Sequence, residues 1–294
     1  MKKINKVVIP VAGLGTRMLP ATKAIPKEML PVLKKPIIQY IVEETIYAGF
    51  KDIILVTHSS KNSIEDHFDQ SFELEATLEK RVKRSLLKET RAISKLNISM
   101  QSVRQGEAKG LGHAILCTRR LIGKEPFAVI LPDMLISKEN GNAGDSLKKM
   151  RINFENYQIS SVLLGKAKKA DISKYGIAQI KKNSKLPGLG LIEKMIEKPS
   201  IKKAPSNLYA AGRYIFNNDF FKYLSKVKPD KSNEIQLTDA IADYIKDGKK
   251  VNAFPLEGDI FDCGDNAEYI LANLEFAMKD PAMRTKINNY LKTK

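Results

Sequence analysis

The sequence lacks the features that mark membrane-embedded proteins and zinc-binding modules. No stretch reaches the roughly 18 consecutive apolar residues that a membrane helix needs, and the N-terminal lysines lead directly into a strand-like segment rather than a signal peptide. The two cysteines, Cys117 and Cys263, are far apart, and no Cys/His cluster with zinc spacing accompanies them. We therefore expect a soluble, cytoplasmic protein without a membrane partner, in which both cysteines are buried thiols.

Acidic residues are scarce relative to basic ones. The chain has 50 lysines and arginines against 33 aspartates and glutamates, which gives a net charge of +17. Such an excess attracts nucleic acids and membrane surfaces as well as phosphorylated substrates. The basic residues are scattered, however, with short clusters at 80–84 and 166–169 and no stripe of interleaved aromatic residues. We therefore expect no specific binding of nucleic acid.

The first half of the chain alternates strand-like and helix-like segments. Apolar patterns predict strands at 6–11, 52–57, 98–104 and 127–131, and helices at 36–48 and 112–121. Gly49 follows the first of these helices, where a left-handed residue commonly ends a helix. The alternation predicts an α/β fold with parallel strands and crossover helices. The last strand ends at Asp133, and ligands commonly bind at the carboxyl ends of such strands.

The remaining segments differ in pattern. The charge-dense stretch 69–96 carries a thin apolar stripe and reads as a helical excursion on the surface. Shorter strands are predicted at 160–166, 177–181, 191–196, 209–216, 251–254 and 260–262, and two closing helices at 266–278 and 281–291. The second half is therefore expected to extend or cover the sheet.

A glycine-rich loop follows the first strand. Gly13 and Gly15 permit a close approach of backbone to ligand, as in loops that cradle phosphate groups. Met18 occupies the place of the third glycine of a dinucleotide fingerprint, and no GK[ST] closes a P-loop, so neither motif is present. Arg17 and Lys27 lie close behind the glycines in a proline-stiffened stretch, and such cations suit a triphosphate.

The continuation of this loop carries a family resemblance. The segments GLGTR at 13–17 and PKEMLP at 26–31 resemble the signature of the sugar-1-phosphate nucleotidyltransferases, in particular bacterial members that use UTP and glucose 1-phosphate. Ordered matches continue through Thr57 to Lys61, 104–106, 109–113, 131–133, 197–199, 212–214 and 234–239. The resemblance thus covers essentially the whole chain.

The resemblance implies a Rossmann-like, glycosyltransferase-A-like α/β fold with a mixed, mostly parallel central sheet flanked by helices. It implies a nucleotidyltransferase domain over 1–265, with a nucleotide-binding half at about 1–150 and a β-rich sugar-binding half at about 151–265. The C-terminal helices at 266–294 then form an extension with a possible role in oligomerisation. The family is commonly oligomeric, so a homodimer or homotetramer is expected.

The implied reaction transfers uridylyl from UTP to α-D-glucose 1-phosphate and releases pyrophosphate. Two alternatives stay open at this point. One is a nucleotidyltransferase with a different base or sugar, such as dTTP or galactose 1-phosphate. The other is a non-catalytic basic protein that binds a nucleotide sugar or nucleic acid.

By resemblance, Arg17 and Lys27 stabilise the charge that develops at the α-phosphoryl group and on pyrophosphate. Repulsion between phosphates calls for a hard divalent cation, Mg²⁺, and Asp133 is the first candidate ligand. Asp262 aligns with a second metal-side carboxylate of wider nucleotidyltransferases. Where family members carry Asn after the glycine of this late motif, this chain carries Asp265, which either adjusts metal binding or caps the next helix.

The resemblance also assigns the two substrate pockets. The nucleotide is expected to contact Ala12, Gly13, Gly15, Glu28, Gln105 and Gly110, and the sugar phosphate Gly176, Glu197, Lys198 and Gly212. Thr238 and Asp239 begin an amphipathic helix, and helix capping is the expectation for them. His58 and His113 are expected to be structural or to support other residues, because the reaction needs no proton relay.

Overall fold

The computed structural model describes residues 2–59, 61–182 and 185–293. Ser60, which belongs to one of the motifs above, lies outside the described residues. In the first half, the strands are β1 (Lys6–Pro10), β2 (Pro31–Val32), β3 (Lys35–Pro36), β4 (Asp52–Thr57), β5 (Ser99–Arg104), β6 (Phe127–Ile130) and β7 (Met134–Ser137). The helices are α1 (Ile37–Tyr47), α2 (Asn62–Asp66), α3 (Phe72–Lys80), α4 (Arg84–Ser94), α5 (Gly110–Cys117), α6 (Arg119–Ile122) and α7 (Asp145–Tyr157).

The second half is richer in strands before it ends in helices. Its strands are β8 (Ser160–Lys166), β9 (Ile177–Lys181), β10 (Gly190–Ile196), β11 (Leu208–Phe216), β12 (Val251–Pro255) and β13 (Asp259–Asp262). Its helices are α8 (Phe220–Leu224), α9 (Leu237–Lys246), α10 (Asn266–Lys279) and α11 (Pro281–Lys292). Short 3-10 helices at Thr16–Met18, Ala21–Lys23 and Lys27–Met29 shape the loop after β1.

One nine-stranded sheet runs through the molecule, in the order β5-β4-β1-β6-β11-β8-β12-β10-β9. The first four strands are parallel, as is the β8–β12 pair, whereas β11 is antiparallel to both of its neighbours in this order. An additional β11–β9 pairing bends the second half back on itself. The expected mixed sheet is confirmed, and its parallel character belongs mainly to the first half.

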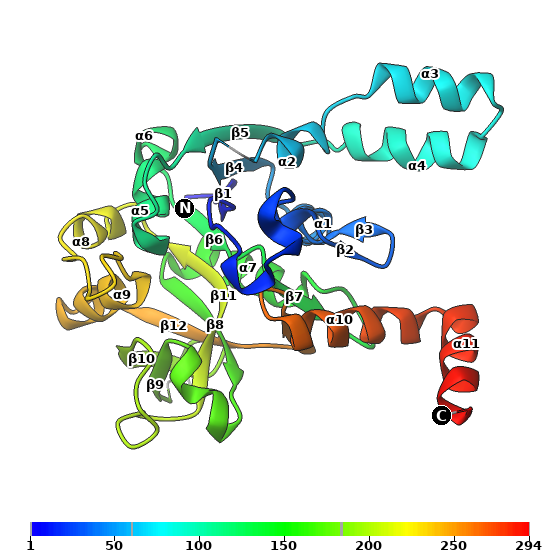
Figure 1. Ribbon diagram of the computed structural model, residues 1–294. Helices are drawn as coiled ribbons and strands as arrows, with labels where there is room; N and C mark the ends of the chain where they lie inside the picture. Colours follow the sequence, from blue (N-terminus) through cyan, green and yellow to red (C-terminus); the bar gives the residue numbers. More distant parts are fainter. Residues whose placement is uncertain (1, 60, 183–184, 294) are drawn as a thin grey trace.

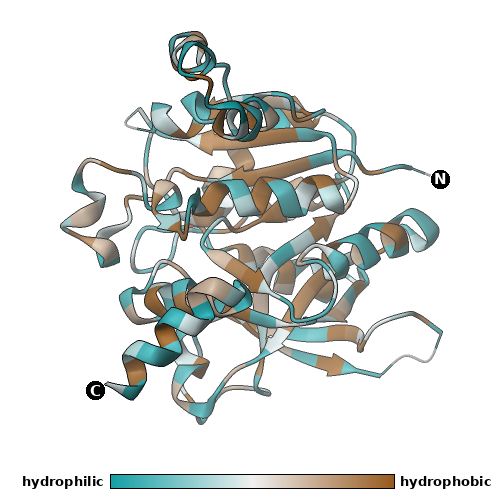
Figure 2. Cartoon of the chain, turned by 90° about the vertical axis from the view of Figure 1, so that its right-hand side faces the viewer, coloured by the Kyte–Doolittle hydropathy of each residue, from teal (hydrophilic) through white to brown (hydrophobic). Residues whose placement is uncertain are grey.

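The sheet has a hydrophobic core on each face because successive strand residues point to opposite sides. In β1, Val7 and Ile9 belong to the cluster that packs under α1 and α7, while Val8 belongs to the cluster under α5, α8 and α9. Figure 2 shows the brown strands between helices whose outward sides are mostly teal. The result is a three-layer α/β/α arrangement that leaves the carboxyl ends of β1, β4, β5 and β6 at one edge.

Two helical features extend from this body. The stretch predicted as a single surface excursion is a hairpin of α3 and α4, broken at Val82, whose φ of 53° is left-handed. Near the C-terminus, α10 reaches outward from the body and α11 turns at its tip (Figure 1). Within the described part of the chain, α11 buries none of its residues. The chain contains no described helix that is both long and apolar enough to span a membrane.

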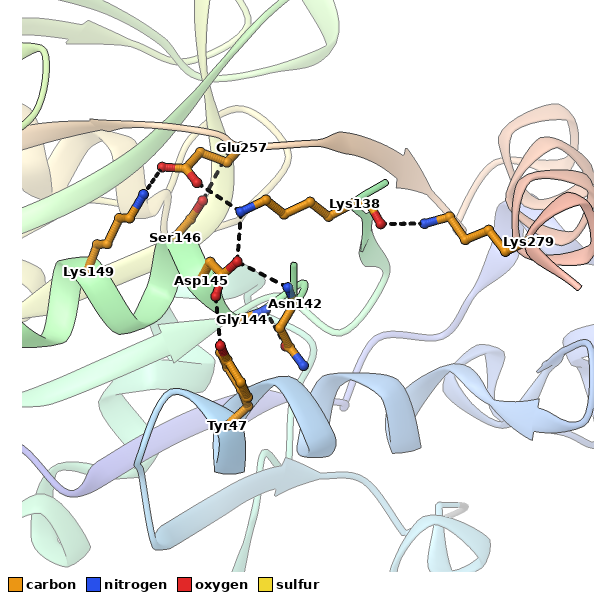
Figure 3. A network of polar contacts seen from close by, with 9 residues as sticks. All are labelled: Tyr47, Lys138, Asn142, Gly144, Asp145, Ser146, Lys149, Glu257 and Lys279. Atoms are coloured by element: carbon orange, nitrogen blue, oxygen red, sulfur yellow. Dashed lines mark hydrogen bonds and ion pairs between the residues drawn. The ribbon is translucent and has the colours of Figure 1, made fainter. Parts of the chain in front are cut away.

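A polar network fastens the base of the C-terminal helices to the body (Figure 3). Lys138 contacts Asp145 at 2.7 Å and Glu257 at 3.0 Å, and its carbonyl accepts from Lys279 of α10 at 2.8 Å. Tyr47 of α1 donates to the same Asp145. The hydrogen bond from Lys138 is the main cause that lowers the pKa of Asp145 to about 2. The loop before α7 is thereby held between α1 and α10.

Candidate active site

A cleft of about 430 Å³ opens at the carboxyl ends of the parallel strands. Its walls come from the loop after β1, the residue after β5, the start of α5, the end of β6 and Glu234. Six predicted site residues line it, namely Ala12, Gly13, Lys27, Gln105, Gly110 and Asp133. This is the edge where ligands bind in open α/β sheets. Residues from distant parts of the sequence therefore meet in one cleft at this edge of the sheet.

Gly15 shapes the loop and does not line the cleft. Its φ of 66° is left-handed, and Thr22 donates a hydrogen bond to its carbonyl at 2.7 Å. A Cβ here would lie 3.3 Å from both Thr22 and Lys27. Glycine thus lets the loop fold back onto the turn that carries Lys27.

Two ion pairs form the charged centre of the site. Lys27 Nζ lies 2.5 Å from Asp133 Oδ2, and Arg17 Nη1 lies 3.1 Å from Asp262 Oδ2. Burial alone would raise the pKa of Asp133, but the charge and hydrogen bond of Lys27 outweigh it, and the pKa is lowered. Burial likewise opposes the charge of Lys27, yet Asp133 holds its pKa above the ordinary value. Lys27 and Asp133 are therefore both charged at neutral pH.

The two carboxylates are brought together by a strand pair, because Asp133 immediately precedes β7 and Asp262 is the last residue of β13. Asp262 ends β13, which pairs antiparallel with β7, and the amide of Cys263 donates to the Asp133 carbonyl at 2.8 Å. A Cβ at Gly264 would lie 2.7 Å from Arg17 Nη2, 3.0 Å from Asp262 Oδ1 and 3.3 Å from Asp133 Oδ2. The charged groups thus converge around a glycine that leaves them room. Neither β7 nor Gly264 was predicted, because only the pairing of β7 with β13 reveals them.

The donor set at this centre fits a hard divalent cation. Mg²⁺ typically takes one or two carboxylates and completes its shell with phosphate oxygens and water. Asp133 and Asp262 supply that number, and the described residues contain no cluster of three or more potential metal-ligating side chains. Asp265 accepts instead from the amides of Ala267 and Glu268, so its side chain caps α10. The departure at Asp265 is thus accounted for by helix capping.

Gln105 is oriented from two sides in the wall of the cleft. Its Nε2 donates to the Gly110 carbonyl at 3.1 Å and lies 3.0 Å from Nδ1 of His113. The φ of Gly110 is 81°, and a Cβ there would lie 2.8 Å from Glu234. The supporting role expected for His113 agrees with its contact to Gln105. These two contacts fix the orientation of the Gln105 amide at the wall of the cleft.

Glu28 occupies a different setting from the rest of the nucleotide group. Its side chain is fully buried, with Oε2 2.7 Å from Lys61 Nζ, and it does not belong to the lining of the cleft. Its Oε1 has no hydrogen-bond partner among the described residues. Burial raises the pKa of Glu28 despite the opposing charges of Lys61 and Lys27. Lys61 ends one of the matched motifs, but the sequence predicts no role for it.

A second group of predicted residues lies at the ends of strands β9 and β10 and on strand β11. Thr238 Oγ1 donates to Glu197 Oε2 at 2.7 Å beside Gly176. The next residue, Lys198, has a left-handed φ of 40°, an uncommon conformation that often marks functional positions. Gly212 has a φ of 75°, and its carbonyl accepts from the amide of Leu131, two residues before Asp133. Strand β11 thus connects the two groups.

Two smaller expectations are wrong. Thr238 does not cap its helix, since Gln236 precedes α9 and the described start of that helix has no side-chain cap. The Thr238 hydroxyl binds the Glu197 carboxylate instead. Cys263 is buried as expected, but Cys117 is only partly buried because it lies at the end of α5 near the surface.

Comparison with known proteins agrees with this geometry. The model of the nucleotidyl transferase family matches residues 6–279. The chain belongs to the nucleotidyl transferase family. A relative from Haemophilus ducreyi named UTP–glucose-1-phosphate uridylyltransferase is 50% identical over 276 residues, 93% of each chain. The nucleotidyl transferase family generally uses a divalent metal, in accord with the two carboxylates.

Solved structures in this family have the same fold. A UTP-bound UGPase from Acinetobacter baumannii superposes with a TM-score of 0.88 at 39% identity, covering 99% of both chains. A UDP-glucose pyrophosphorylase complexed with UDP-glucose gives 0.83 at 42% identity, covering 95% of this chain and 100% of the other. The α/β nucleotidyltransferase fold predicted from the motifs is confirmed.

Proposed function

We propose that this protein transfers uridylyl from UTP to α-D-glucose 1-phosphate, giving UDP-glucose and pyrophosphate. The observation that carries the proposal is the meeting of Lys27 and Arg17 with Asp133 and Asp262 beside a glycine-lined cleft. Relatives that are about half identical over nearly the whole chain carry the name of this activity. A basic loop and a pair of acidic groups suit the handling of two polyanions.

In this reaction a phosphate oxygen of glucose 1-phosphate attacks the α-phosphorus of UTP, and the bond to the β-phosphate oxygen breaks. Lys27 and Arg17 stabilise the negative charge that grows on the transferred group and on pyrophosphate. Gly13 and Ala12 let the triphosphate approach the backbone. No side chain needs to accept a proton, because the attacking oxygen is already ionised. Catalysis is then positioning and charge stabilisation.

We assign Asp133 and Asp262 as the residues that hold Mg²⁺. When bound, the ion neutralises phosphate charge and helps to align the two substrates. Both carboxylates are paired with cations here, Asp133 with Lys27 and Asp262 with Arg17. These ion pairs keep the acidic and basic groups close together. With substrates present, the carboxylates would hold the metal and the cations would contact the phosphates.

The remaining assignments divide the cleft between base and sugar. Ala12, Gly13, Gly15, Glu28, Gln105 and Gly110 are proposed for the nucleotide, and Gly176, Glu197, Lys198 and Gly212 for the sugar phosphate. This agrees with a nucleotide-binding half over 1–150 and a sugar-binding half over 151–265. Glu234 is an exception, since it belongs to the second half and lines the nucleotide cleft.

The C-terminal segment 266–294 is proposed to mediate a homodimer or homotetramer. Ile270 of α10 is 65% exposed and Leu291 of α11 is 61% exposed, and such side chains favour burial between subunits. Light scattering of the whole chain and of a chain shortened after Lys279 tests the proposal. A shortened chain that forms oligomers with the same number of subunits as the parent would contradict the proposal. The reaction is proposed to take place in the cytoplasm, in keeping with two unpaired cysteines.

A substrate panel tests the activity. Purified protein with Mg²⁺ is given UTP, dTTP or ATP together with glucose 1-phosphate or galactose 1-phosphate, and nucleotide sugar and pyrophosphate are both measured. UTP with glucose 1-phosphate should give the largest kcat/KM, and a chelator should abolish turnover. No UDP-glucose at saturating substrates would overturn the proposal. A larger kcat/KM for another pair would keep the family chemistry and change its specificity.

A further inference from the structure

The short contact between Thr238 and Glu197 stands out among the polar contacts of the sugar side. The two oxygens are 2.7 Å apart, Thr238 is 6% exposed, and the Glu197 side chain is 23% exposed. The second carboxylate oxygen of Glu197 lies 3.8 Å from Lys198 Nζ. One oxygen of Glu197 thus accepts a hydrogen bond from a buried residue, while the Glu197 side chain remains partly accessible to solvent.

The surroundings are built to allow this contact. A Cβ at Gly176 would lie 2.7 Å from the Thr238 hydroxyl and 3.2 Å from Glu197 Oε2. Only a residue without a side chain fits between these atoms. Glu197 follows the end of β10, and Gly176 precedes β9, so the pairing of β9 with β10 brings them together.

Thr238 is itself held in place by its helix and by the nucleotide cleft. Leu237 and Ile241 of α9 are buried in the core under the sheet. Three residues before Thr238, Ile235 donates to the Lys109 carbonyl at 2.9 Å and accepts from the Gly112 amide at 2.8 Å. The segment that places Thr238 is therefore the same one that forms a wall of the nucleotide cleft.

We propose that Thr238 is a positioning residue whose hydroxyl fixes the Glu197 carboxylate in the orientation that receives a sugar hydroxyl. The inference rests on the proposed function and adds a residue to it. An ionised carboxylate has about four acceptor positions, so one bond from Thr238 leaves others for the substrate. A hydrogen bond to a charged group is strong enough to select one rotamer of Glu197. Thr238 acts on the sugar through Glu197 and has no direct part in the chemical step.

The test compares Thr238→Val, which has the same shape without the donor, with Thr238→Ser, which keeps the donor. Thr238→Val should raise the KM for glucose 1-phosphate about tenfold, the scale of losing one charged hydrogen bond, and leave the KM for UTP unchanged. Thr238→Ser should restore most of the affinity. Thr45→Val is the matched control, because Thr45 is fully buried and its hydroxyl donates to the Ile41 carbonyl within α1.

A double-mutant cycle decides whether Thr238 works through Glu197. On a Glu197→Gln background, Thr238→Val should add little further loss, whereas independent roles would add. Parent affinity for glucose 1-phosphate in Thr238→Val, equal losses for both substrates, or additive losses would each overturn the inference. If Thr238→Val does not fold, Thr238→Ala, which also removes the hydroxyl, and Glu197→Gln give the same cycle singly and together. Failure of the parent protein to make UDP-glucose would instead remove the proposed function.

Discussion

At the scale of single residues, Lys27 and Asp133 form a short, mostly buried ion pair in the wall of the cleft, beside the glycine-rich loop. We expect Lys27→Ala and Asp133→Ala each to lower kcat by at least about 10², the scale of losing one electrostatic transition-state contact. Steady-state production of UDP-glucose measures it. Lys34→Ala is the control, since that side chain is 77% exposed and pairs only loosely with Glu89. Near-parent rates in either variant would remove that residue from catalysis.

Glu28 and Lys61 present a different residue-scale problem, a fully buried ion pair. Lys61→Met should destabilise the protein by about 3–5 kcal/mol, because it leaves a buried carboxylate without its counter-charge. The same change should raise the folded-state pKa of Glu28 further above its ordinary value. Above the pKa of Glu28 in the unfolded chain, Glu28 keeps its proton in the folded variant and loses it in the unfolded chain. The stability of the variant therefore falls as the pH rises through the unfolded pKa.

Urea unfolding at pH 5 and pH 8 therefore checks the Lys61 prediction. The deficit of Lys61→Met relative to the parent should be larger at pH 8, where deprotonation of the buried Glu28 is costly. Lys34→Met, which removes an exposed lysine at the Lys34–Glu89 pair, should cost about 0–1 kcal/mol at both values. A deficit that does not change with pH would show that Glu28 stays charged without Lys61.

The sequence predicts the cleft residues better than it predicts what orients them. Gly13, Lys27 and Asp133, which line the cleft, are predicted because they belong to short motifs in which neighbouring residues in the sequence indicate the chemistry. Lys61 and Thr238 had no assigned role at the site, because their partners lie 33 and 41 positions away. Side-chain pairs of that separation are determined by tertiary packing, which no local pattern contains.

At the scale of elements, strand β11 ties the site to helix α1 through a fully buried pair. Arg213 Nη2 lies 2.6 Å from Glu44 Oε2, and Arg213 Nη1 donates to the carbonyl of Met134, the residue after Asp133. Arg213→Met should cost about 3–5 kcal/mol because Glu44 is left buried and unpaired, whereas the double change to apolar residues at 44 and 213 should recover much of the loss. Urea unfolding of the single and double variants measures the coupling free energy between Glu44 and Arg213.

The outcome for Arg213 also separates stability from geometry. If the pair only stabilises the fold, the double apolar variant should regain both stability and kcat. If Arg213 also holds the turn that carries Asp133, stability should return while kcat stays low, because the Met134 carbonyl has lost its donor. A single variant as stable as the parent would contradict the buried-pair argument.

Elements with a clear period were predictable almost to the residue. Strands β4, β8 and β9 have the predicted bounds, and α1 differs by about one residue at each end. Strand β7 and helix α7 were not predicted, since β7 is only four residues long and the glycines and asparagines before α7 suggest a loop. The break between α3 and α4 depends on the left-handed backbone conformation of Val82. A β-branched residue rarely adopts this conformation, and the sequence pattern gives no sign of it.

At the scale of the whole molecule, the net charge of +17 should attract the two anionic substrates of the proposed reaction. Electrostatic attraction of this kind is screened over about 10 Å at 0.1 M salt, so only charges near the cleft should matter at moderate salt. We expect the KM for UTP to rise with added KCl, while sucrose of equal osmolality leaves it unchanged. Reversing Lys80 and Arg81, at the tip of the α3–α4 hairpin that projects from the body (Figure 1), should leave that KM as it is. A raised KM for UTP in the charge-reversed variant would show that the overall charge of the protein, rather than the charges near the cleft, attracts UTP. Binding of RNA at nanomolar concentration and physiological salt, without turnover, would favour a nucleic-acid partner instead.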